Sequence, residues 1–160
     1  MRVAVPLEPN ARGLRIAIVS SRYHDAVVSR LADGAAQAFL DAGGADERLL
    51  RIDCPGAFEL PVVAASLIRL NTIDAVVCVG LVLTGETTHD KHIADSVAHA
   101  LQDLSLETGK PVAFGVLTCQ TMEQAEARAG GTRGNKGEEA MRAAILAVAA
   151  VRAARKAAGS

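Results

Sequence analysis

The stretch AVVCVGLVL, from Ala75 to Leu83, constrains the fold more than any other part of the sequence. Every residue in it is apolar or glycine, whereas a strand with one face in water alternates apolar and polar side chains. A strand without this alternation is expected where helices cover both faces of a parallel sheet. The stretch therefore predicts a buried strand of a layered α/β domain.

Other apolar runs alternate with segments of helical period. Further strands are predicted at RIAIVS (15–20), ERLLRID (47–53) and PVAFGVLT (111–118). Helices are predicted between residue 24 and the Gly43–Gly44 stop, from about Glu59 to Leu70, and after residue 92. Two more helices follow, with capping residues at Thr121/Gln124 and at Asn135/Glu138. This alternation predicts right-handed crossovers and a three-layer αβα sandwich with a four-stranded parallel, flavodoxin-like sheet.

The chain length of 160 residues predicts a single domain, residues 1–160, with residues 1–13 as an extended N-terminal arm. No apolar run approaches the eighteen or so residues that cross a bilayer, and the start lacks the apolar region of a signal peptide. We therefore expect a soluble, cytoplasmic protein without a membrane partner. Cys54, Cys78 and Cys119 are odd in number and widely spaced, which favours free thiols.

The charge balance argues against a nucleic-acid partner. Seventeen Lys and Arg face eighteen Asp and Glu, the formal net charge is -1, and only 2% of residues are aromatic. Neither a basic surface for phosphates nor a set of rings for base stacking is visible.

Polar segments follow all four predicted strands. They are SSRYHD, CPGAFE, TGETTHDKH and TCQT, in chain order. Parallel strands end at the same edge of a sheet, where ligands of such folds bind, so these segments predict a site at that edge.

The segment GETTHDKH, residues 85–92, has several interpretations. Its hydroxyls can simply cap a helix, or the free N–H groups of Gly85 to Thr87 can bind a phosphate or carboxylate. His89 can be a surface residue or a proton-transfer group, because imidazole exchanges protons near neutrality. A metal site built from His89, His92 and His99 lacks a fourth ligand of characteristic spacing.

Other residues leave similar alternatives. Cys119 can approach His89 as a hydrolase nucleophile or pack as a small strand-end residue. Arg128 and Lys136, near the glycine-rich AGGTRGN, can neutralise a phosphate or face water. Tyr23 can pack over the first strand or serve as a platform for a planar ligand.

Five motifs together resemble the lumazine synthase family. They are PGAFELP (55–61), G-x-V-x-x-GETTH (80–89), FGVLT (114–118), EQAEARAG (123–130) and GNKGEEA (134–140), in matching order and spacing. The resemblance implies the condensation of 5-amino-6-(D-ribitylamino)uracil with 3,4-dihydroxy-2-butanone 4-phosphate in riboflavin biosynthesis. It implies no metal and no organic cofactor.

The resemblance also implies roles for individual residues. His89 is the expected general acid/base. The expected pyrimidine- and ribityl-binding residues are Tyr23, Ala57, Phe58, Glu59, Leu81, Val82, Leu83 and Phe114. The expected phosphate-binding residues are Glu86, Thr87, Arg128 and Lys136. Phe114 is expected to come from a neighbouring subunit.

The family pattern is broken inside GETTHDKH. Many relatives have an arginine before GET and an aromatic residue after the histidine, whereas this chain has Thr84 and Asp90, followed by Lys91 and His92. Asp90 can orient His89, although it more simply places a favourable charge at a helix start. These departures bear on substrate affinity and not on the class of reaction.

The resemblance further implies assembly. The family forms pentamers, and some members close into sixty-subunit shells, with riboflavin synthase as a candidate partner. The alternative to an enzyme is a catalytically weak capsid-like or engineered assembly subunit of the same fold.

Overall fold

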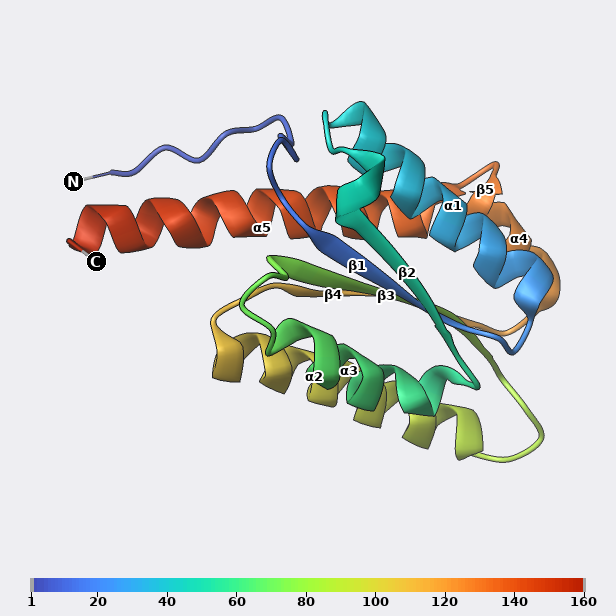
Figure 1. Ribbon diagram of the computed structural model, residues 1–160. Coiled ribbons are helices and arrows are strands. Elements are labelled where there is room, and N and C mark those ends of the chain that lie inside the picture. Colours follow the sequence, from blue (N-terminus) through green and yellow to red (C-terminus); the bar gives the residue numbers. More distant parts are fainter. Residues whose placement is uncertain (1, 160) are drawn as a thin grey trace.

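The structure is a computed structural model that describes residues 2–159. A four-stranded parallel sheet of order β2-β1-β3-β4 forms its centre. The strands are β1 (Ile16–Ser21), β2 (Leu49–Cys54), β3 (Ala75–Leu83) and β4 (Val112–Cys119). Helices cover both faces of the sheet (Figure 1), which confirms the predicted three-layer sandwich with a flavodoxin-like sheet.

The helices are α1 (Asp25–Asp41), α2 (Leu60–Ile68), α3 (His89–Thr108), α4 (Met122–Arg128) and α5 (Lys136–Ala158). In Figure 1, α1 and α5 lie above the sheet and α2 and α3 below it. Two 3-10 turns, η1 (Asp46–Arg48) and η2 (Ala57–Glu59), flank β2. A small antiparallel pair, β5 (Ala129–Gly131) and β6 (Gly134–Asn135), was not predicted, because its glycine-rich strands are too short to show a period.

The AVVCVGLVL stretch is confirmed as the strand β3, and eight of its nine residues are buried. Alternate residues of the sheet face two separate apolar clusters. Ile18 and Val77 belong to the cluster under α1 and α5, while Val19 and Val76 belong to the cluster over α2 and α3. The absence of alternation in the sequence therefore reflects burial on both faces.

The α1/α5 face is tightly packed. A Cβ atom at Gly137 would overlap the carbonyl oxygen of Leu31, and one at Gly34 would overlap the side chain of Asn135. The Asn135 side-chain oxygen accepts hydrogen bonds from the N–H groups of Gly137 (2.9 Å) and Glu138 (3.2 Å), which confirms the predicted cap. The Asn135 amide donates to the Arg30 carbonyl at 2.9 Å and so ties α5 to α1.

The predicted cap at Thr121 is also confirmed, since its hydroxyl accepts a hydrogen bond from the N–H of Gln124 at 3.3 Å. The return bond differs from a capping box. The Gln124 side-chain oxygen accepts from the N–H of Gln120, one residue before the cap, at 3.0 Å.

The helix predicted from about Glu59 to Leu70 is shorter than expected. The turn η2 occupies residues 57–59, and α2 ends at Ile68. Lys110 fastens this end, because its Nζ lies 3.2, 2.8 and 2.9 Å from the carbonyl oxygens of Ile68, Leu70 and Ile73. The Ile68 carbonyl lies in the last turn of α2, where carbonyls have no helical N–H partner, and the ammonium group binds it together with two carbonyls of the following loop.

The segment before β1 contains no helix or strand over residues 2–15. Its contacts with the rest of the chain include the Ala11 N–H, which donates to the Ala42 carbonyl at 2.8 Å, and the Glu8 carboxylate, which lies 3.7 Å from the Arg142 guanidinium. Arg48 Nε donates to the Leu14 carbonyl at 3.2 Å. Within residues 2–159, no helix is both long and apolar enough to span a bilayer.

Candidate functional site

A pocket of about 1010 Å³ opens at the edge where the strands end, and we call it the site pocket. It lies between the turns that follow β1 and β2, the end of β3 and the first two turns of α3. Its lining residues are Tyr23, His24, Gly56, Ala57, Phe58, Glu59, Leu81, Val82, Leu83, Gly85, Thr87, His89, Asp90, His92, Ile93 and Ser96. Three of the four predicted strand-end segments therefore meet in one place.

The turn after β1 presents an aromatic ring and an imidazole. Tyr23 is 71% exposed, so its ring does not pack over β1 as a core residue. His24 has a φ of 59° and is the one non-glycine residue with positive φ among residues 2–159. This left-handed residue starts α1 without a side-chain cap, which leaves its imidazole free to line the pocket.

The turn after β2 holds a carboxylate close to the Tyr23 ring. A Cβ atom at Gly56 would lie 3.0 Å from Glu59 Oε2 and 3.4 Å from Tyr23 Cδ2, so glycine allows both groups to approach. The Glu59 carboxylate, half-buried, has no hydrogen bond or ion pair with another residue of the 2–159 range. An acceptor without a partner is suited to bind the hydroxyl groups of a ligand.

A buried thiol lies beneath this turn. Cys54 is buried and donates a hydrogen bond from its Sγ to the Gly56 carbonyl at 3.3 Å. Burial, and then the nearby carboxylates of Glu59 and Asp53, raise the pKa of Cys54 to about 11. The thiol of Cys54 is therefore neutral at physiological pH.

Helix α3 enters the pocket with two histidines on one face. The Thr87 hydroxyl accepts a hydrogen bond from the His89 N–H at 3.4 Å, which orders the turn before the helix. His92 follows one turn later and also lines the pocket. Asp90 makes no hydrogen bond to His89 in the described part of the chain, in agreement with the view that it does not orient that ring.

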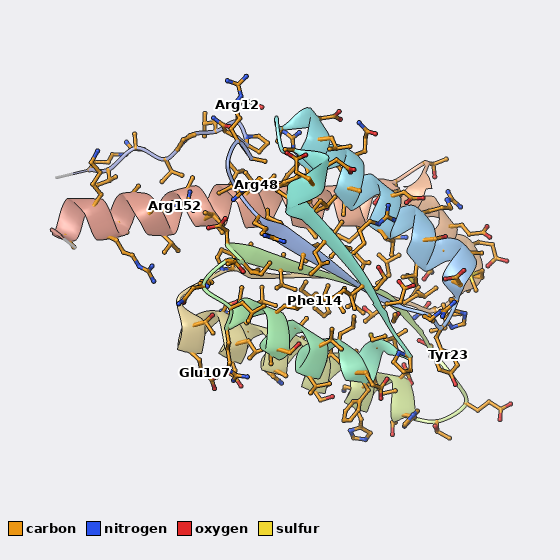
Figure 2. All side chains as sticks on the ribbon, viewed as in Figure 1. Arg12, Tyr23, Arg48, Glu107, Phe114 and Arg152 are labelled. Carbon is orange, nitrogen blue, oxygen red and sulfur yellow. The ribbon has the colours of Figure 1, made fainter. Side chains whose placement is uncertain are left out.

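A second hollow of about 630 Å³, the edge groove, lies between α3 and the edge strand β4. Phe114 lines it and is 41% exposed, because α3 does not cover the outer part of β4. Figure 2 shows Phe114 well back along the sheet from Tyr23, which stands at the strand ends. Thr84 and Lys91 also line the edge groove, and Asp90 lines both hollows.

The predicted phosphate-binding residues do not meet within one chain. Glu86 lies in the exposed turn before α3 but does not line the site pocket. Arg128 ends α4 and donates from Nη1 to the Gln124 carbonyl at 3.0 Å, and Lys136 pairs with Glu139 at 2.6 Å. The pocket lining contains the carboxylates of Glu59 and Asp90 but no lysine or arginine.

The hydrolase hypothesis for Cys119 finds no support in this arrangement. Cys119 lines the edge groove and is buried in the α1/α5 cluster, whereas His89 lines the site pocket. Burial raises the pKa of the Cys119 thiol, which opposes formation of a nucleophilic thiolate. Among residues 2–159, no three His, Cys, Asp or Glu side chains are grouped so that they could hold a metal ion.

The sequence analysis missed His24, Ile93 and Ser96 as lining residues. His24 directly follows Tyr23 in a strand-end segment, and Ile93 and Ser96 come four and seven residues after His89. Helical spacing from His89 was therefore the signal that could have found the last two.

Comparison with known proteins identifies the family. A model of the 6,7-dimethyl-8-ribityllumazine synthase family matches residues 13–152. The chain is 46% identical to the 6,7-dimethyl-8-ribityllumazine synthase of Aquifex aeolicus over 124 residues, 78% of this chain and 80% of that protein. It is 47% identical to the protein of the same name from Deinococcus radiodurans over 120 residues, 75% and 77% of the two chains. With a strand-end pocket lined by an aromatic ring, a free carboxylate and a helix-borne histidine, the chain belongs to the 6,7-dimethyl-8-ribityllumazine synthase family.

Proposed function

We propose that this protein condenses 5-amino-6-(D-ribitylamino)uracil with 3,4-dihydroxy-2-butanone 4-phosphate to 6,7-dimethyl-8-ribityllumazine, a step of riboflavin biosynthesis. One observation carries the proposal: a single pocket gathers nine of the thirteen residues that the family resemblance implied. These nine are Tyr23, Ala57, Phe58, Glu59, Leu81, Val82, Leu83, Thr87 and His89.

In this proposal the exposed Tyr23 ring stacks on the pyrimidine, and the free carboxylate of Glu59 accepts hydrogen bonds from ribityl hydroxyls. The backbone of residues 81–83, at the end of β3, meets the pyrimidine edge. The turn Gly85–Thr87 receives the phosphate of the second substrate, since the N–H groups before α3 have no helical partners.

The chemistry consists of imine formation, phosphate elimination and ring closure. These steps transfer protons but neither oxidise nor reduce the substrates overall. Holding two substrates together can lower the barrier by about 7–11 kcal/mol, while a placed acid/base group contributes roughly 10²–10⁴-fold. Positioning by the pocket is therefore the larger contribution, and His89 assists the proton transfers.

We also propose that the working site is shared between adjacent subunits of a homopentamer. The phosphate brings negative charge to a pocket whose lining has two carboxylates and no lysine or arginine. Arg128, Lys136 and Phe114 lie outside that pocket, so a neighbouring subunit can supply the missing charge and ring. A pentamer ring joins two different surfaces head to tail, as this division of the residues requires.

Four further properties of the protein stay predictions. They include a sixty-subunit shell, a complex with riboflavin synthase, a cytoplasmic location and independence of metals and organic cofactors. The catalytically weak capsid-like or engineered assembly subunit is not favoured, because the chain matches the synthase family and its pocket holds the free Glu59 carboxylate and two histidines of α3.

The direct test of the activity is an assay of the purified protein with both substrates and no added metal. The expected result is formation of the lumazine chromophore faster than the uncatalysed condensation. A fully assembled, folded sample that shows no such acceleration would overturn the proposed enzyme in favour of the assembly subunit.

The test of the shared site is to refold together two variants, His89→Ala and Phe114→Asp. With random equal mixing, roughly a quarter of the interfaces combine an intact His89 with an intact Phe114. Activity is expected to rise above the mean of the separate samples. If both variants assemble and exchange subunits without this gain, each site belongs to one chain.

A further inference from the structure

The site pocket contains a second imidazole on α3 besides that of His89. His92 comes three residues later, so the two rings lie on the same face of the helix. His92 lines the pocket and is exposed, with one side-chain hydrogen bond within residues 2–159. Its side chain is therefore available to a ligand.

That contact places the His92 ring at the start of α3. Side chains on a helix tilt toward its N-terminus, and the Nε2 atom of His92 lies 3.5 Å from the Thr88 hydroxyl. Thr88 is the residue before the helix, yet its side chain makes no capping hydrogen bond. The ring thus lies beside Thr88, which directly follows the turn Gly85–Thr87 proposed to receive the phosphate, and Gly85, Thr87 and His92 line the same pocket.

The charged and titratable groups that face this part of the pocket come from three elements. Tyr23 and His24 come from the turn after β1, Glu59 from η2, and His89 and Asp90 from α3 itself. Within residues 2–159 of one chain no lysine or arginine lines the pocket, so the imidazoles are the groups by which this chain itself can bring positive charge to the lining.

We propose that protonated His92 donates its proton to the phosphate that leaves during the condensation. This inference rests on the proposed function. At the imine stage a base, for which His89 is available, removes the proton from C3 of the butanone unit. The C3–C4 double bond forms, the C4–O bond breaks, and its electron pair goes to the phosphate oxygen. That oxygen takes the proton of His92, which becomes neutral.

The experiment measures phosphate release in a single turnover, with the enzyme in excess over the butanone phosphate. This readout follows the elimination even where another step limits steady-state turnover. His92→Gln is expected to slow phosphate release by about tenfold to a hundredfold, with little change in the KM for either substrate. Thr88→Val, which removes the hydroxyl facing the ring, is expected to slow the same step by a smaller factor.

The matched control is His99→Gln, an exposed histidine on the same helix that does not line the pocket. Its phosphate release is expected to equal that of the parent. The three variants and the parent are expected to unfold at the same temperature, because the side chains of His92, Thr88 and His99 are exposed. Equal unfolding temperatures would exclude a folding defect as the cause of slower phosphate release.

The pH profile separates proton donation from a merely structural role. In the parent, phosphate release is expected to fall on the alkaline side, where the proposed acid His92 has lost its proton, and in His92→Gln this fall should disappear. Phosphate release in His92→Gln at the parent rate, or with the parent's alkaline fall, overturns the inference. A change in KM alone overturns it too, because it assigns His92 to binding. A parent protein without lumazine formation would instead contradict the proposed function.

Discussion

On one face of the sheet, α1 and α5 approach so closely that neither Gly34 nor Gly137 could carry a Cβ atom without overlap. On the other face, α2 and α3 leave the site pocket and the edge groove open. Residues of the same chain pack closely on the first face, while the second face has polar groups without partners in the described chain, such as the Glu59 carboxylate. Stability and function are thus divided between the two sides of one sheet, and substitutions on each side should have different consequences.

The largest loss of stability is expected on the tightly packed face that α1 and α5 cover. Gly137→Ala places a Cβ atom against the backbone carbonyl of Leu31, which cannot rotate away, so the free energy of unfolding should fall by about 3 kcal/mol. Urea denaturation measures the change. Gly85→Ala is the matched control on the open face, because no atom lies within 4 Å of its added Cβ and its φ is not positive. Equal losses in the two variants would contradict the comparison.

A smaller loss is expected at the end of the open face that lies away from the pocket. Lys110→Met leaves the carbonyls of Ile68, Leu70 and Ile73 without their ammonium donor, which should lower the free energy of unfolding by about 2 kcal/mol. Chemical denaturation measures it, with the exposed Lys156→Met as control. A loss no larger than in the control would mean that water replaces the lysine at no cost.

The buried thiol of Cys54 makes stability depend on alkaline pH. The pKa of Cys54 is about 11 in the folded chain against roughly 8.5 for a free thiol, so folding favours the protonated form. This contribution is complete below pH 8.5 or so and is lost as pH rises toward 11, by roughly 3 kcal/mol in all. Cys78 and Cys119 act in the same direction, since burial raises the pKa of both thiols.

The measurement compares the free energy of unfolding of the parent and of Cys54→Ala between neutral pH and pH 10.5. The parent should lose more stability over this range than the variant, because the variant lacks one of the three thiols. Parallel pH curves would show that the Cys54 thiol is more accessible to water than its burial indicates.

The smallest change in stability is expected at Glu59, on the open side. Glu59→Gln removes a carboxylate that has no partner within residues 2–159, so the free energy of unfolding should change by less than about 0.5 kcal/mol. The KM for the ribityl substrate should nevertheless rise roughly tenfold to a hundredfold, since hydrogen bonds to a charged group are lost. The exposed Glu47→Gln should change neither quantity. A large loss of stability in Glu59→Gln would place this residue among the structural ones.

Periodicity predicted the elements whose environment is uniform along their length. The strand β3 is buried on both faces, and its continuous apolar run indicated this directly. The pair β5 and β6 could not be predicted, because two short glycine-rich strands carry no period. The end of α2 is bound by Lys110, which is 42 residues from Ile68 in the sequence. The residues around Ile68 alone therefore could not predict where the helix ends.

The site was predictable to the extent that its residues follow the strands or match a family motif. Tyr23, Glu59 and His89 satisfy both conditions and line one pocket. His24 carries only the first signal, and its positive φ depends on the way the turn enters α1. The separation of Phe114 and Arg128 from the pocket is a property of the folded chain, which only the structure reveals.

The hydrogen bond from Asn135 to the Arg30 carbonyl also bears on how the chain folds during synthesis. The two residues are 105 positions apart, so α1 is complete long before the helix that covers it exists. At roughly 5–20 residues per second, a ribosome needs about 5–20 s to make the intervening chain. During this interval the apolar side of α1 has no α5 to cover it. The nascent protein is therefore most prone to aggregate just before its C-terminal helix emerges, and chaperones would have most to protect at that stage.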